Sequence, residues 1–129
     1  MQRKQISSGT HWETQVGYSR AVRVGNQVFV AGTTATDSSG ELVGKRDPYA
    51  QTVQALKNIE AALTRIGASL KDVVRTRIYV TNINNWEAIG KAHKNAFRHI
   101  QPVTTMVEVN GLIDPAMLVE IEAEAIIAD

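Results

Sequence analysis

The chain has 129 residues, of which 43% are hydrophobic and 21% are charged, with a formal net charge of +1. This length fits one domain over residues 1–129, and a near-neutral charge without any basic run argues against a nucleic-acid partner. The absence of cysteine excludes disulfides, thiol catalysis and thiolate metal sites. No apolar run follows the polar start, so we expect no signal peptide, no membrane partner and a cytoplasmic location.

The first part of the chain predicts short strands joined by turns. We expect an edge strand near residues 3–7, followed by a loop, and then strands at residues 20–24 and 27–32. Gly25-Asn26 separates the last two strands and is typical of a two-residue hairpin, because both positions tolerate positive φ. A brief strand is expected at residues 41–43.

Two helices are predicted in the middle of the chain. Asp47-Pro48 opens the first, because aspartate caps free amides and proline suits the first turn, and Gly67 ends it. The second helix begins at Asn84 or Asn85 and runs to about residue 100. Apolar stripes at helical spacing comprise Tyr49, Val53, Leu56, Ile59, Leu63 and Ile66 in the first helix, and Trp86, Ile89, His93, Ala96 or Phe97, and Ile100 in the second.

Alternating side chains predict three further strands, one between the helices and two after them. In the strand at residues 73–81, one face carries Val74, Thr76, Ile78 and Val80, and the other Arg75, Arg77 and Tyr79. The strand at residues 103–109 alternates in the same way. The last strand has one face of Val119, Ile121, Ala123, Ala125 and Ile127, and another of Leu118, Glu120, Glu122, Glu124 and Ile126.

These elements predict an α+β fold, in which a single mixed sheet in β-β-α-β-α-β-β order carries both helices on one face. The other face, with its arginines and glutamates, is left uncovered. It is either a solvated face with cross-strand ion pairs or an interface between subunits, and alternation alone does not decide between the two.

Several segments resemble the Rid/YjgF family of small imine-hydrolysing proteins. The resemblance is carried by Pro102-x-x-x-x-Val107-Glu108-Val109, by Leu118-Val119-Glu120-Ile121-Glu122-Ala123, by residues 17–22 (GYSRAV) and by residues 28–34 (VFVAGTT). It implies a chorismate-mutase-like fold and a homotrimer whose sheets form a central barrel. It also implies a small-molecule substrate or ligand in a pocket at each subunit junction, with no cofactor. No metal is expected, because His11 and His99 have no spacing typical of metal ligands.

The same resemblance implies site residues. Glu120 and the backbone carbonyl of Met106 would hold a water molecule, and Tyr18 and Gly32 would line the substrate pocket. Each has an alternative interpretation from the sequence alone. Glu120 is one of three alternating glutamates on a polar face, and Tyr18 would serve equally well as an aromatic residue packed at a strand edge.

One position departs from the family pattern. Family members that deaminate amino-acid-derived imines carry arginine two residues after the proline, and here that position is Thr104, which cannot form a bidentate carboxylate clamp. The family asparagine on the second helix is replaced by Gly90. The chain therefore resembles an arginine-lacking subgroup.

Two residues could compensate for the missing arginine. Arg20 shares a strand face with Tyr18 and would point near a pocket that Tyr18 lines, although a surface arginine at the start of the strand is the favoured interpretation. His93 lies on an apolar stripe, which favours a hydrogen-bonded core residue over a proton shuttle.

Two functions remain open. The first is a deaminase with altered specificity, in which Glu120 and Met106 handle water while Tyr18, Gly32, Thr104, Arg20 and His93 bind substrate. The second is a non-catalytic trimer that binds a small metabolite or a protein. Ribonuclease activity, also attributed to the family, is disfavoured by the near-neutral charge and the lack of a histidine pair.

Overall fold

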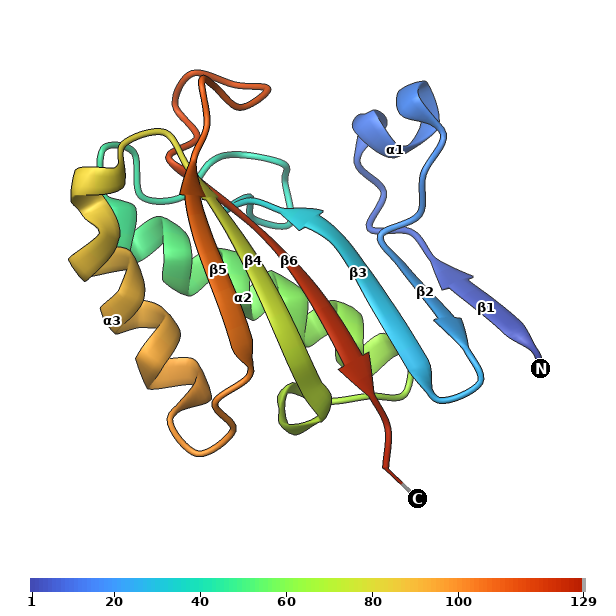
Figure 1. Ribbon diagram of the computed structural model, residues 1–129. Coiled ribbons are helices and arrows are strands. Elements are labelled where there is room, and N and C mark those ends of the chain that lie inside the picture. Colours follow the sequence, from blue (N-terminus) through green and yellow to red (C-terminus); the bar gives the residue numbers. More distant parts are fainter. Residues whose placement is uncertain (129) are drawn as a thin grey trace.

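Six strands form one mixed sheet in the computed structural model, which describes residues 1–128 (Figure 1). The strands are β1 (Arg3–Ile6), β2 (Ala21–Val24), β3 (Gln27–Thr33), β4 (Val73–Val80), β5 (Val103–Glu108) and β6 (Val119–Ile126). Their order across the sheet is β1-β2-β3-β6-β4-β5. Among the strands within residues 1–128, only the β4–β5 pair is parallel, and β6 pairs with both β3 and β4, so the predicted mixed sheet is confirmed.

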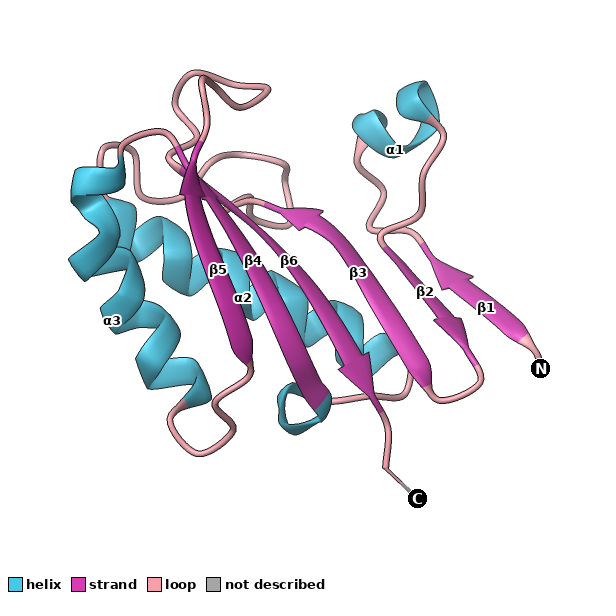
Figure 2. Cartoon of the chain, in the orientation of Figure 1, coloured by secondary structure: helices cyan, strands magenta, loops and turns pink. Residues whose placement is uncertain are grey.

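Two helices cover one face of this sheet, as predicted (Figure 2). They are α2 (Pro48–Arg65) and α3 (Trp86–Phe97), with short 3-10 turns η1 (Leu70–Asp72) and η2 (Ile83–Asn85) beside β4. The Asp47 side chain accepts a hydrogen bond of 3.0 Å from the Ala50 amide and so caps α2. Gly67, just beyond its end, adopts the left-handed φ of 92°. None of the helices within residues 1–128 is long and apolar enough to cross a membrane.

A single apolar core fills the space between the sheet and the helices. The alternation in β6 is observed as predicted, because Val119, Ile121, Ala123 and Ala125 are all buried against the helices. The helices contribute Leu56, Ile59 and Leu63 from α2, and Ile89 and Phe97 from α3. Burial of each large aliphatic side chain stabilises the fold by roughly 1.5–3 kcal/mol.

Four local predictions were wrong. Residues 11–16, expected in a loop, form the short helix α1, and residues 41–43 form no strand but only an isolated bridge between Leu42 and Thr36. A bulge between Val73 and Arg75 puts an extra residue into β4, so Val73 is buried and Val74 is 40% exposed. Trp86 is 56% exposed because it is the first residue of α3 and precedes the helix residues that are buried against the sheet.

The second face of the sheet carries no helix, and charged side chains pair across it. Arg77 on β4 makes a 2.8 Å ion pair with Glu124 on β6, and Arg75 lies 3.6 Å from the same carboxylate. Tyr79 donates a hydrogen bond to Glu122. The expected cross-strand ion pairs are therefore present. Apolar side chains exposed on or beside this face are Phe29, Val74, Val103, Val107 and Ile126.

Candidate active site

The Glu120 carboxylate lies against Gly32 on the neighbouring strand. These two residues, with Tyr18 and Arg20, line a cavity of about 860 Å³ between the N-terminal segment, the loop after β3 and one side of α2. Gly32 belongs to a bulge in β3, where the pairing with β6 shifts between Val30 and Thr33. A Cβ added to Gly32 would overlap the Glu120 carboxylate and lie 2.9 Å from its Cδ. Four predicted site residues are thus brought together.

The surroundings of Glu120 act on its protonation in opposite directions. Burial raises the pKa of the Glu120 carboxyl, the positive charge of Arg20 lowers it, and the negative charge of Glu122 raises it again. The net result is a raised pKa. A carboxylate with a raised pKa is a better proton acceptor than an exposed one, as a general base requires.

Arg20 is buried rather than on the surface, so the favoured interpretation was wrong; its residue surface is only 8% exposed. The bulge in β3 is the physical reason. Carbonyls of a bulge leave the regular ladder and need other donors, and Arg20 Nη1 donates to the Gly32 carbonyl at 2.8 Å and to the Thr33 hydroxyl at 3.0 Å. Its guanidinium also lies 5.7 Å from the centre of the Tyr18 ring.

Glu13 on α1 is the residue that sequence reasoning missed. It is only 4% exposed, and one carboxylate oxygen lies 3.6 Å from Arg20 Nε. Burial raises its pKa, but hydrogen bonds from Ser8, Ser7 and Thr10 outweigh burial, so the pKa of Glu13 is lowered and the group is ionised. A single glutamate in a polar N-terminal segment carries no periodic signal, and so nothing in the pattern distinguished it from a solvated one.

His93 and Thr104 meet in a second, smaller cavity of about 290 Å³ between α3 and the start of β5. Thr76, which is fully buried on β4, links them, because its hydroxyl lies 2.9 Å from His93 Nε2 and 2.8 Å from the Thr104 hydroxyl. Burial lowers the pKa of His93, so the imidazole is neutral at pH 7. His93 is therefore the hydrogen-bonded, partly buried residue that its position on the stripe predicted.

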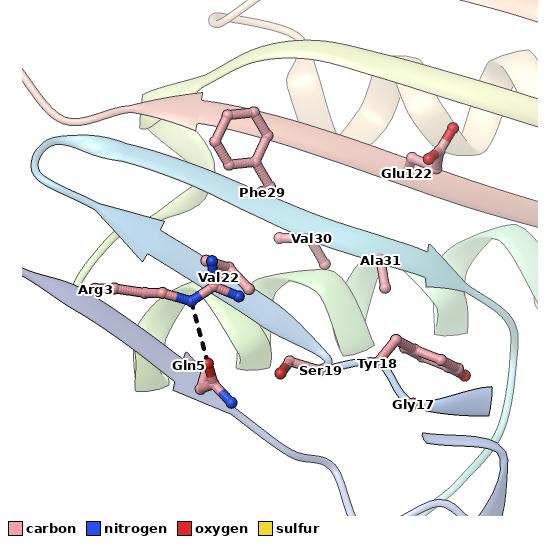
Figure 3. A pocket seen from close by; sticks show the side chains of 10 residues that line it. All are labelled: Arg3, Gln5, Gly17, Tyr18, Ser19, Val22, Phe29, Val30, Ala31 and Glu122. Carbon is pink, nitrogen blue, oxygen red and sulfur yellow. Dashed lines mark hydrogen bonds between the residues drawn. The ribbon is translucent and has the colours of Figure 1, made fainter. Parts of the chain in front are cut away.

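The predicted site residues do not all meet within one chain. Met106 lies on the edge strand β5, packs against the core and lines neither cavity. Tyr18 also borders a third hollow of about 480 Å³ on the open side of β1, β2 and β3, where Phe29 and Glu122 face it (Figure 3). No three histidine, aspartate or glutamate side chains within residues 1–128 are placed to hold a metal ion.

Known proteins resemble this chain over nearly its full length. The family model described as Endoribonuclease L-PSP matches residues 9–127. Rv2704 from Mycobacterium tuberculosis, described as a member of the YjgF/YER057c/UK114 family, is 54% identical, with a TM-score of 0.90 and coverage of 98% of this chain and 100% of that one. SCO2049 of Streptomyces coelicolor is 40% identical over 95% of this chain and 90% of its own. The 3-aminoacrylate deaminase RutC of Acinetobacter baylyi is 32% identical over 84% of this chain and 85% of its own length.

Proposed function

We propose, from the premise that the chain belongs to the Rid/YjgF family, that it is a cofactor-free hydrolase that deaminates a small reactive imine or enamine. The position of Glu120 carries this proposal. Its carboxylate lies in a cavity beside Gly32, and burial raises its pKa. The similarity to a 3-aminoacrylate deaminase supports the same reaction class.

The reaction needs little beyond a placed water molecule and a proton acceptor. Water attacks the C=N carbon while Glu120 accepts one of its protons and delivers it to the nitrogen, which gives a carbinolamine. Glu120 then accepts the proton of the carbinolamine hydroxyl and delivers it to the nitrogen, so that ammonia leaves as the C=O bond forms. The net change converts C=NH and water into C=O and ammonia, so no oxidant or reductant takes part.

The proposal includes a homotrimer in which neighbouring subunits complete each site. Within one chain, Glu120 lies in one cavity and Thr104 and His93 in another, while Met106 lies in neither. The uncovered sheet face, with its exposed apolar side chains, is a surface on which such subunits could pack. In the trimer, Met106 would offer its carbonyl to the water, and Thr104 would contact substrate from the adjacent subunit.

A non-catalytic binding module is the second candidate, and Thr104 favours it. The Thr104 hydroxyl already bonds Thr76 at 2.8 Å and cannot replace a bidentate arginine, so the usual hold on a substrate carboxylate is missing. Under this alternative the trimer and the cavity persist, and a metabolite binds without turnover.

Ammonia release distinguishes the two candidates. Imines with and without a carboxylate would be generated in situ by an amino-acid oxidase and an amine oxidase, respectively. The wild type would be compared on both with Glu120→Gln, which keeps the shape of the side chain but cannot accept the proton. We expect Glu120→Gln to lose at least about 100-fold in rate, in line with the loss of a general base. Glu87→Gln, an exposed position on α3, is the matched control. A wild type that releases no ammonia above the buffer, while binding ligands, would favour the binding module.

A further inference from the structure

Arg20 lines the Glu120 cavity and forms a buried ion pair with Glu13, which does not line the cavity itself; we call this the Glu13–Arg20 pair. Both side chains are at least nine-tenths buried, and both residues come from the N-terminal segment. The pair is fixed from both ends. Arg20 Nη1 bonds the β3 bulge, while Glu13 accepts hydrogen bonds from the Ser8 amide at 3.2 Å and the Thr10 hydroxyl at 3.0 Å.

An arginine in such a cavity would ordinarily attract a carboxylate. The edge of the guanidinium formed by Nε and Nη2 matches the two oxygens of a carboxylate. Here Nη2 has only a 3.5 Å contact to the Tyr18 hydroxyl, and buried Nε has no hydrogen-bond partner among residues 1–128. That edge is not open to a ligand, however, because the Glu13 carboxylate lies 3.6 Å from Nε.

The charge balance of the cavity follows from this pair. Glu13 neutralises Arg20, and Glu120 adds a further acidic group. Arg65 also lines the cavity, but it is exposed on α2, and its Nη1 donates to the Ser7 carbonyl at 2.8 Å. A ligand carboxylate placed in this cavity would therefore meet the carboxylate of Glu120 and an arginine whose charge Glu13 neutralises.

We propose that Glu13 is a specificity-determining residue, because it masks the charge of Arg20. The cavity then selects C=N compounds that are uncharged or cationic at the reacting end over compounds that bear a carboxylate there. The inference rests on the proposed function for its substrate class, although the charge selection itself applies to any planar ligand of this cavity. A protonated imine has the favoured charge, because an iminium group is a planar cation.

Three probes of one shape test the charge selection without any turnover. Benzoate, benzamide and benzamidinium differ at one planar group in charge, from negative to neutral to positive. Their dissociation constants would be measured by titrating each probe into ¹⁵N-labelled protein and recording the NMR shifts of the amide signals of the cavity residues. We expect benzamidinium and benzamide to bind more tightly than benzoate. Tighter binding of benzoate by the wild type, or no binding of any probe, would overturn the inference.

Glu13→Gln supplies the sharper comparison, because it removes the masking charge while it retains the size of the side chain. We expect it to tighten benzoate binding by roughly tenfold relative to benzamide, the usual effect of one charge-assisted hydrogen bond. Glu87→Gln makes the same charge change on an exposed helix surface and should not alter the affinity for any of the three probes. If Glu13→Gln fails to fold, Arg20→Met should shift preference further toward benzamidinium, because Glu13 is then uncompensated.

The outcomes separate this inference from the proposed function. A wild type that orders the probes as expected but releases no ammonia supports the charge selection and contradicts the deaminase. A wild type that deaminates and yet binds benzoate best, or a Glu13→Gln variant with unchanged benzoate affinity, contradicts the role of Glu13 alone.

Discussion

Replacement of Gly32 by alanine should separate activity from stability. The new Cβ would lie 2.9 Å from Glu120 Cδ, whereas carbon atoms in contact normally lie about 3.5–4.0 Å apart, so the carboxylate must retreat by about 1 Å. A displacement of that size at a reacting group costs about 100-fold in rate. The backbone of Gly32 is not in the left-handed region, and the group that must move is the end of a flexible side chain. The free energy of unfolding should therefore fall by only about 1 kcal/mol.

The assay is kcat/KM for ammonia release, with urea unfolding measured on the same preparations. Gly111→Ala is the matched control, because nothing lies within 4 Å of its added Cβ, and it should keep full activity. If Gly32→Ala folds and retains wild-type kcat/KM, Glu120 does not act from the position described here. If instead it loses several kcal/mol of stability, the contact is structural and the argument from carboxylate displacement fails.

Three further predictions concern His93, Gln51 and Thr104. The pKa of His93 is lowered in the folded state, so the unfolded chain binds more protons than the folded chain as pH falls through about 6.5. Acid should therefore lower the melting temperature of the wild type more than that of His93→Gln between about pH 7.5 and pH 5. An equal dependence of melting temperature on pH in the two proteins would refute this. Gln51→Leu leaves the Ala116 carbonyl and the Leu118 amide without partners, while the Gly44 carbonyl keeps its bond from the Asp47 amide. It should cost about 2 kcal/mol in urea unfolding, whereas a loss below about 1 kcal/mol would contradict the hydrogen bonds. Thr104→Arg should increase deamination of carboxylate-bearing imines by about tenfold or more, and no gain would argue against Thr104 as a substrate contact.

The regular elements were predictable because the polarity and backbone preference of each residue indicate locally whether it is buried, helical or in a turn. The alternation in β6 names the buried side of the strand, and Asp47-Pro48 marks the start of α2 without reference to any distant residue. The bulges in β3 and β4 were not predictable in this way. Each depends on how many residues the partner strand places opposite, so the exposure of Val74 is a property of the pair of strands.

The candidate site was predictable only in part, for the same reason. The family resemblance identified Glu120, Gly32 and Tyr18, and the structure places them in one cavity. The burial of Arg20 could not be read from its neighbours, because its partners are the carbonyl of Gly32 and the carboxylate of Glu13. Tertiary contacts between polar groups leave no periodic pattern in a sequence.

The central place of β6 has a consequence for how the protein is made. This strand follows all the others in the chain, yet it joins β3 to β4. Until β6 leaves the ribosome, the nascent chain holds two separate half-sheets with unpaired inner edges, which are templates for wrong pairing. The sheet and its core are therefore complete only after the strand that also carries Glu120 has emerged.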